Sequence, residues 1–233
     1  MKRFYKDVAV EAAESGWRVT LDGRPIRTQG GAAQVVPTRA LAEALAEEWR
    51  AQGDEIDPKS FVMRDLANYA IDRIAPDPAA SVARLLAYAE TDTLCYRADP
   101  DEPLYRRQHE LWEPLLQAAE ARHGVRLERI SGVVHRPQPP ETLARLREVL
   151  AALDPFTLAA LETLTSLAAS LTIGLLALER DSDPDALFAA ANCEQDWQAE
   201  QWGWDAQAEQ GRELRRNAFA QATRFARLAQ EAD

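Results

Sequence analysis

The sequence has little cysteine, and its two cysteines, Cys95 and Cys193, lie far apart in no Cys-x-x-Cys pattern. Structural zinc sites and disulfide frameworks need several cysteines at short spacings. The three histidines, His109, His123 and His135, share no metal-ligand spacing either. The sequence therefore predicts no metal site, and its cysteine usage is typical of a reducing compartment.

Basic residues are also scarce relative to acidic ones. The chain has 27 Lys and Arg residues against 38 Asp and Glu residues, which gives a formal net charge of −11 at pH 7. A protein that binds the phosphate backbone of nucleic acid needs clustered positive charge. The composition therefore predicts no nucleic-acid partner and favours a soluble protein with an acidic surface.

Motifs that bind nucleotides or activate a nucleophile are missing as well. Gly30 and Gly31 are adjacent, but no Gly-Lys-Ser/Thr sequence follows them and no Gly-x-Gly-x-x-Gly pattern occurs. Such loops are what usually cradles a phosphate. The sequence has no Gly-x-Ser-x-Gly elbow and no evident Cys–His pair that would support nucleophilic catalysis. We therefore expect no cofactor.

A secretion signal and a membrane span are absent too. The stretch MKRFYKDVAV contains no apolar region of signal-peptide type. The most apolar segment, residues 155–178, is interrupted by Thr165, Ser166, Ser170 and Thr172, whereas a membrane helix needs about 20 predominantly apolar residues. We expect no membrane insertion and a bacterial cytoplasmic location, or the mitochondrial matrix for a mature organelle form.

The same apolar segment organises the expected fold. Its leucines recur three or four residues apart on more than one face, which is typical of a helix buried on most sides. We predict one core helix over residues 155–178, with the rest of the chain packed around it.

The first part of the chain has the pattern of a small antiparallel β unit. Polar and apolar residues alternate over residues 4–10 and 17–21, and Asp22-Gly23 follows directly. Asp-Gly between alternating segments is a strong hairpin signal. Short return strands are expected at residues 26–28 and 34–36.

Helical patterns follow the β unit. Thr38 is placed to cap a helix that runs through Ala51. Further helices are predicted over residues 61–74, 82–94 after a capping Ser81, 104–124, 141–153, 184–202 and 205–232. The expected fold class is α+β, with a small N-terminal β domain over residues 1–57, closed by the helix at about 38–51, and a larger all-α domain over residues 58–233.

Two segments carry candidate chemistry. In the first, Glu90 and Asp92 could form a carboxylate pair for acid/base work, although residues two apart do not share a helix face. Capping of a helix end, with Leu94 and Tyr96 in the core, is the structural alternative.

The second segment, residues 193–204, places Glu194, Trp197, Gln198 and Gln201 on one helix face. It predicts either a protein-binding surface or a helix with core tryptophans and a solvated acidic face. The sequence leaves both open.

Six stretches together resemble a known family. They are KRFYKDV, LDGRPIRT, VPTRALAEALAEEWRAQ, YAETDTLCYRA, HELWEPLL and EQDWQAEQWG, which span Lys2 to about Gly203. In combination they are similar to the assembly chaperones of F-type ATP synthase that act on the α subunit. The resemblance implies a β-rich N-terminal domain followed by a helical domain. It also implies an ATP-independent chaperone that binds the free α subunit, protects it from aggregation and yields it to the β subunit.

The resemblance assigns roles to particular positions. The family's acidic-Gln-Trp-Gly motif matches Glu194, Gln198, Trp202 and Gly203, and its Glu-Trp-x-x-Gln motif includes Trp49. We therefore expect client binding by Trp49, Glu194, Gln198 and Trp202. The remaining matched positions are Glu48 and Gln52, and the possible structural motif Thr91, Asp92 and Thr93. After Gly203 the sequence lacks the His-Asp pair associated with mitochondrial members.

Two other functions remain alternatives at this point. One is a small α+β enzyme that uses Glu90 and Asp92, or Glu194 and Glu200, on an unidentified substrate, although Glu194 and Glu200 diverge on a straight helix. The other is a structural subunit of a permanent complex. That role would require a large exposed apolar area, which the acidic composition does not suggest.

Overall fold

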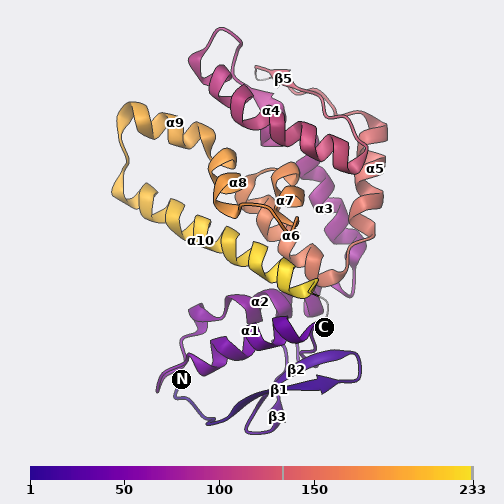
Figure 1. Cartoon of the computed structure of the whole chain (residues 1–233), viewed down its shortest axis with the longest axis vertical. Coiled ribbons are helices and arrows are strands. Elements are labelled where there is room, and N and C mark those ends of the chain that lie inside the picture. The colour runs from indigo at the N-terminus through magenta and orange to yellow at the C-terminus, as the bar shows by residue number, and fades with distance from the viewer. Residues whose placement is uncertain (133, 232–233) are drawn as a thin grey trace. The chain divides into compact units, whose positions relative to one another are not determined.

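The computed structural model describes residues 1–132 and 134–231, and Figure 1 shows their helices and strands. The described chain divides into two compact units. Unit 1 contains Met1–Pro78, Asp154–Ala160 and the described part of Arg224–Asp233. Unit 2 contains Ala79–Leu153, without residue 133, and Leu161–Thr223.

Unit 1 begins with a three-stranded antiparallel sheet in the order β1-β2-β3, formed by β1 (Val8–Ala13), β2 (Gly16–Leu21) and β3 (Arg24–Pro25). The turn between β2 and β3 is Asp22-Gly23, and both residues have positive φ, 48° and 73°. Two successive positive φ values define the type I′ turn that suits the twist of a hairpin. The predicted hairpin is therefore confirmed, although β3 ends at Pro25 instead of continuing over residues 26–28.

Helix α1 (Arg39–Arg50) packs its apolar face in the core of unit 1. Its N-cap is Thr38, as predicted, because the Leu41 amide donates to the Thr38 hydroxyl at 3.1 Å. The same hydroxyl donates to the Leu228 carbonyl at 2.6 Å, across 190 residues of sequence. One side chain thus both caps α1 and joins the start of the chain to α10 (Ala206–Ala229).

Helix α2 (Val62–Tyr69) follows a short 3-10 turn, η1 (Pro58–Ser60), and continues into a π-helical turn, η2 (Ala70–Ile74). The Glu48 carboxylate accepts the amides of Met63 at 2.6 Å and of Arg64 at 2.9 Å. This bond pair caps α2 from α1. Residues 58–78 accordingly belong to unit 1, whereas the boundary predicted near residue 57 assigned them to the helical domain.

The apolar segment 155–178 is buried as expected, but it forms two helices, α6 (Pro155–Ala168) and α7 (Leu171–Ala177). Ala169 adopts a left-handed φ of 49° between them. Ser170 then caps α7 by accepting the Ile173 amide at 3.1 Å. The single predicted helix is therefore a tight pair of helices, and all seven residues of α7 are buried.

The other helices of unit 2 follow the predicted order with altered ends. Ser81 does not cap α3 (Pro78–Glu90) but lies inside it, where its buried hydroxyl donates to Glu162 at 2.6 Å. The helix predicted over residues 184–202 is divided at Asn192, and the predicted end of the last helix at Ala232 lies outside the described residues. The remaining elements of unit 2 are η3 (Thr93–Cys95), β4 (Tyr96–Arg97), α4 (Pro103–His123), β5 (Ile130–Ser131), α5 (Pro140–Ala151), α8 (Pro184–Ala191) and α9 (Cys193–Trp202).

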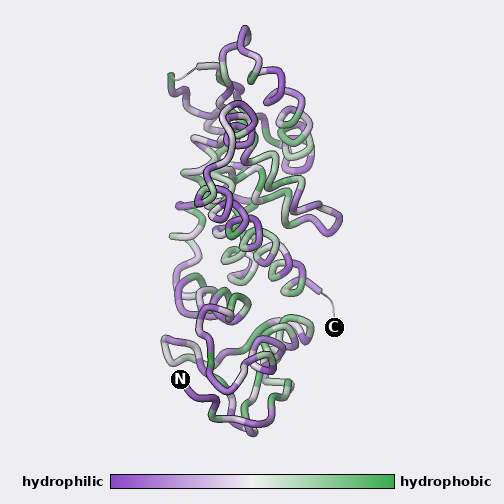
Figure 2. The backbone as a smooth tube through the Cα atoms, turned by 90° about the vertical axis from the view of Figure 1, so that its left-hand side faces the viewer, coloured by the Kyte–Doolittle hydropathy of each residue, from purple (hydrophilic) through white to green (hydrophobic). Residues whose placement is uncertain are grey.

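The α+β class predicted from the sequence is confirmed: a small antiparallel sheet lies in the N-terminal part and helices dominate the rest. Hydrophobic residues alternate with hydrophilic ones along most of the chain in Figure 2. Within residues 1–132 and 134–231, no helix combines the length and the apolar character that crossing a membrane requires.

Candidate functional site

Helix α9 presents one stripe of side chains formed by Glu194, Gln198 and Trp202. These residues are four apart, and on an α-helix that spacing keeps them on one face. Trp202 ends the helix and is 80% exposed, an unusual state for the largest apolar side chain. The structure thus brings together three of the four residues expected to bind a client.

The buried side-chain amide of Gln108 holds the carboxylate of Glu194 in position. Gln108 of α4 is fully buried, and its Oε1 accepts the Ala98 amide at 2.8 Å. Its Nε2 donates to Oε1 of Glu194 at 2.7 Å. A carboxylate at the surface would otherwise be free to change rotamer, so Gln108 gives it a defined position.

Ion pairs hold the side chains beside the stripe. Arg107 of α4 donates twice to Glu200, at 2.5 and 2.8 Å, and its guanidinium lies 5.7 Å from the centre of the Trp197 ring. Arg212 of α10 makes a similar bidentate pair with Asp196, at 2.8 and 2.6 Å. Pairs of this kind contribute little to stability at a surface, but they restrict side-chain conformation.

The Thr91-Asp92-Thr93 segment lies at the break between α6 and α7. Asp92 is buried, and its two carboxylate oxygens accept the amides of Leu94 at 3.1 Å and of Thr172 at 2.9 Å. Burial raises the pKa of Asp92, and these amide bonds oppose that rise. Thr93 donates its hydroxyl to the Ala169 carbonyl at 2.8 Å. The segment thus caps η3 and stabilises the left-handed turn at Ala169.

The carboxylate pairs of the enzyme alternative do not form in this structure. Glu90 is exposed at the end of α3, whereas Asp92 is buried with both oxygens bonded to backbone amides. Glu194 is held by Gln108 and Glu200 by Arg107, so these two carboxylates have separate partners. In the described part of the chain, no group of His, Cys, Asp and Glu residues could hold a metal ion.

A recess of about 390 Å³ lies next to the stripe, and no pattern in the sequence pointed to it. It is lined by Thr91, Thr93, Tyr96, His135 and Glu194. Strands β4 and β5 pair in parallel, with Tyr96 opposite Ile130 and Arg97 opposite Ser131. The Tyr96 hydroxyl is 2.9 Å from Nδ1 of His135. Tyr96 is half-buried at the recess, not in the core as expected.

Charged side chains support β4. Arg97, which is 5% exposed, donates to Glu113 at 2.7 Å. Arg129 donates to the other oxygen of Glu113 at 2.9 Å and also pairs with Glu120. The hydrogen bond from Arg129, with that from Arg97, holds the pKa of Glu113 at about 2.

Glu113→Gln is expected to lower the free energy of unfolding by about 1 to 2 kcal/mol at pH 7. A pKa unit corresponds to about 1.4 kcal/mol, and solvent around this partly exposed carboxylate screens a share of the full effect. The folded pKa lies below the ordinary value of 4.5, so the carboxylate stabilises the fold above pH 4.5 and stops doing so as pH falls towards 2. Urea unfolding at a series of pH values should show the two proteins converging in acid. Parallel curves from pH 7 to pH 2 would contradict this assignment.

Trp49 is placed differently from the expectation that it binds a client. Its ring is 8% exposed and lies in unit 1, with the Phe61 ring centre at 4.5 Å and the Tyr5 ring centre at 5.5 Å. The Tyr5 hydroxyl also donates to the Trp49 carbonyl at 2.6 Å. In this structure the indole is a core side chain because an aromatic cluster covers it.

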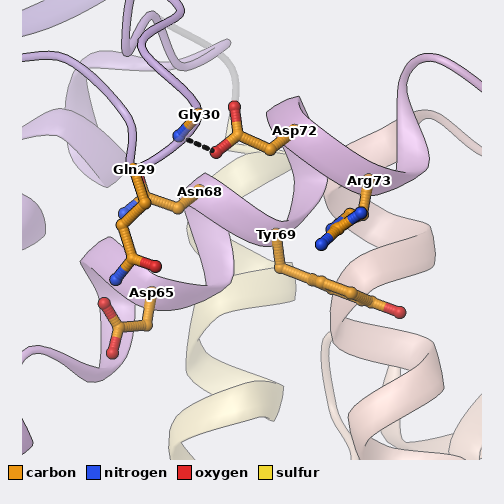
Figure 3. A pocket seen from close by; sticks show the side chains of 7 residues that line it. All are labelled: Gln29, Gly30, Asp65, Asn68, Tyr69, Asp72 and Arg73. Carbon is orange, nitrogen blue, oxygen red and sulfur yellow. Dashed lines mark hydrogen bonds between the residues drawn. The ribbon is translucent and has the colours of Figure 1, made fainter.

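Unit 1 has a polar recess of its own, of about 590 Å³, beside α2 and η2 (Figure 3). Asp72 accepts the Gly30 amide at 2.8 Å and the Thr28 hydroxyl at 2.7 Å, which fixes the loop at the rim. Tyr69 and Arg73 extend to the opposite side of the view from Gln29. Both Asp72 oxygens have partners, so this carboxylate holds the loop in place.

Comparison with known proteins identifies the family. Residues 2–120 match the family described as ATP12 chaperone protein. The crystal structure of Atp12 from Paracoccus denitrificans is 40% identical, covers 98% of each chain and superposes with a TM-score of 0.94. The chain belongs to the ATP12 chaperone family.

Further relatives agree with membership of the ATP12 family. A crystal structure from Agrobacterium tumefaciens is 39% identical, covers 97% of this chain and 84% of its own, and superposes with a TM-score of 0.90. The mitochondrial protein atp12 of Schizosaccharomyces pombe is 27% identical over 214 residues, which are 87% of this chain and 74% of that protein. The resemblance seen in the sequence is therefore confirmed, and relatives named as chaperones indicate a non-enzymatic role. The family match ends before α9, whereas the solved structures extend over it.

Proposed function

We propose that this protein is an assembly chaperone of the F-type ATP synthase that binds the free α subunit of the catalytic headpiece. It masks the subunit interface of α against aggregation, independently of ATP, and hands α to the β subunit. Membership of the ATP12 family supports this role. The observation that carries it in the structure is the exposed Trp202 at the end of the α9 stripe.

The stripe has the composition of a reversible protein-binding surface. An unassembled subunit exposes an apolar surface that its neighbour normally covers, and such surfaces aggregate. A chaperone needs an aromatic anchor for this surface and polar groups that give specificity. Trp202 supplies the anchor, and Glu194 and Gln198 supply the polar groups. A single exposed tryptophan on a small stripe also suits displacement by a partner with a larger interface.

The first experiment measures light scattering by isolated α subunit with and without an equimolar amount of this protein. We expect suppressed aggregation, a complex of α with this protein in native mass spectrometry, and loss of that complex when β is added. Absence of both protection and complex would refute the proposal. A complex that persists in the presence of β would instead favour the structural subunit of a permanent assembly.

Trp202→Ala is expected to weaken the complex with α by at least about 30-fold, since buried tryptophan anchors contribute about 2 kcal/mol or more to binding. The side chain is exposed in the free protein, so the melting temperature should stay almost unchanged. Phe4→Ala is the matched control because Phe4 is an aromatic residue of unit 1 that is 64% exposed. Calorimetric titration of α into each variant measures the difference. An equal loss for both variants would exclude Trp202 as the specific anchor.

The proposed location follows from the client. A protein that acts on free α subunit must share its compartment, which is the bacterial cytoplasm or, for an organelle form, the mitochondrial matrix. Both compartments keep thiols reduced, in agreement with the two free, buried cysteines among the described residues.

A further inference from the structure

The recess beside α9 combines three segments that are distant in the sequence. Thr91 and Thr93 come from the turn after α3, His135 follows β5, and Glu194 lies in the first turn of α9. None of the residues that line it is a lysine or an arginine. The recess therefore has one negative side chain and no permanent positive charge to neutralise it.

The two threonine hydroxyl groups of the recess are arranged as hydrogen-bond acceptors. Thr93 donates its hydrogen to the Ala169 carbonyl at 2.8 Å, and Thr91 donates to the Ala87 carbonyl at 3.4 Å. A hydroxyl that has donated its only hydrogen can offer a ligand only its lone pairs. Both threonine oxygens consequently favour a ligand that brings donors.

Glu194 adds an acceptor whose position is set in advance. The buried Gln108 binds one carboxylate oxygen, Oε1, at 2.7 Å. An ionised carboxylate accepts about four hydrogen bonds through its two oxygens, so capacity remains for a ligand. Prior fixing of a binding group reduces the entropy lost when the ligand arrives.

We propose that this recess takes a basic side chain of the client, with its charge against Glu194. Guanidinium and ammonium groups have donors and no acceptors, which complements the threonine oxygens and the carboxylate. The inference rests on the proposed function and specifies what the Glu194 end of the stripe recognises. Trp202 would then bind an apolar part of the same surface of α.

Glu194→Gln tests whether the charge of Glu194 is needed for binding at this recess, and it changes the shape of the side chain little. Glutamine keeps an oxygen that can accept the Gln108 amide, so a purely structural link would survive the substitution. Glu209→Gln is the matched control, because Glu209 is an exposed carboxylate in the first turn of α10 and loses the same charge outside the recess. Circular dichroism melts should place both variants within about 2 °C of the original protein.

Affinity for α subunit is then measured by calorimetry at low and high salt. We expect Glu194→Gln to bind at least about tenfold more weakly at low salt and to lose less affinity as salt rises, whereas Glu209→Gln stays within about twofold of the original protein. Equal losses of affinity in both variants would show a general effect of charge and would overturn the proposal that the recess binds a basic side chain. Unchanged affinity of Glu194→Gln would overturn it as well, while leaving the chaperone proposal intact.

A second measurement does not require the α subunit. N-acetylargininamide is titrated into the protein at constant pH while the ring-proton resonances of His135 are followed by NMR. We expect these resonances to shift in the original protein and in Glu209→Gln, but to shift little in Glu194→Gln, and N-acetylglutaminamide to have no effect. Equal shifts in all three proteins, or none, would count against a site for a basic side chain.

Discussion

Gly174→Val is expected to prevent unit 2 from folding. A Cβ atom at residue 174 would lie 2.5 Å from the Thr165 hydroxyl oxygen and 2.9 Å from Cδ1 of Leu161. Both neighbours belong to α6, and threonine is stiff because it branches at Cβ. Overpacking by a methyl group costs about 1 to 3 kcal/mol, and valine adds two further methyl groups at the same position. We therefore expect a loss above about 4 kcal/mol, seen as little soluble protein and no cooperative melt.

A compensating substitution tests the cause of this loss. Gly174→Ala alone should be destabilising by about 2 kcal/mol. Combined with Thr165→Ala, which removes the nearest atom, it should recover much of that loss in a double-mutant cycle. If the two substitutions changed the free energy of unfolding in a strictly additive way, the contact between α6 and α7 would not be the reason that residue 174 is glycine. Urea unfolding of the four proteins provides the measurement.

Asp92→Ala is expected to lower the free energy of unfolding by about 3 to 5 kcal/mol. The substitution leaves the buried amides of Leu94 and Thr172 without acceptors, and each unsatisfied amide costs about 1 to 3 kcal/mol. It also leaves a small cavity at the α6–α7 break. We also expect the recess to change shape, because Thr93 bonds to the Ala169 carbonyl at this break and itself lines the recess. Urea unfolding of the variant beside the original protein measures the loss, and a loss below about 1 kcal/mol would contradict the capping role.

Asp92→Asn is the control for charge. Asparagine keeps the volume and one acceptor oxygen, and it carries no charge. It therefore avoids the cost of burying an ionised group, which is also what raises the pKa of Asp92. Its amide nitrogen would, however, face one of the two backbone donors. We expect about half the loss caused by alanine. A loss from asparagine as large as that from alanine would indicate that the negative charge itself is required.

Local signals in the sequence predicted the local structure well. Asp22-Gly23 indicated a hairpin, and the structure shows it as a type I′ turn, in which both residues have positive φ. Thr38 indicated a helix start because its hydroxyl can cap one. The break at Ala169 had no such signal. Ala169 adopts a left-handed φ, and Ser170 caps the helix that follows it. Thr93, which is distant in the sequence, donates a hydrogen bond to the Ala169 carbonyl, and such a contact cannot be read from the local sequence.

The candidate site was predictable only in part. Helical spacing predicted one face with Glu194 and Gln198, together with Trp197 and Gln201, whereas Trp202 was expected only from the family resemblance. The structure places Glu194, Gln198 and Trp202 four residues apart on α9. The recess was not foreseen, since His135 reaches Tyr96 through two short strands that pair in parallel. The burial of Trp49 could not be predicted either, because the sequence does not tell whether an aromatic ring in a helix lies inside or outside the protein.

The bond between Thr38 and Leu228 has a consequence for the time course of synthesis. Contacts that join distant segments require a large loop to close before they contribute, and they slow folding. A ribosome adds about 5 to 20 residues per second, so these 190 residues need roughly 10 to 40 seconds to appear. The nascent β sheet and α1 must wait that long for the partner supplied by α10. During this interval the Thr38 hydroxyl lacks the acceptor that Leu228 provides in the finished protein.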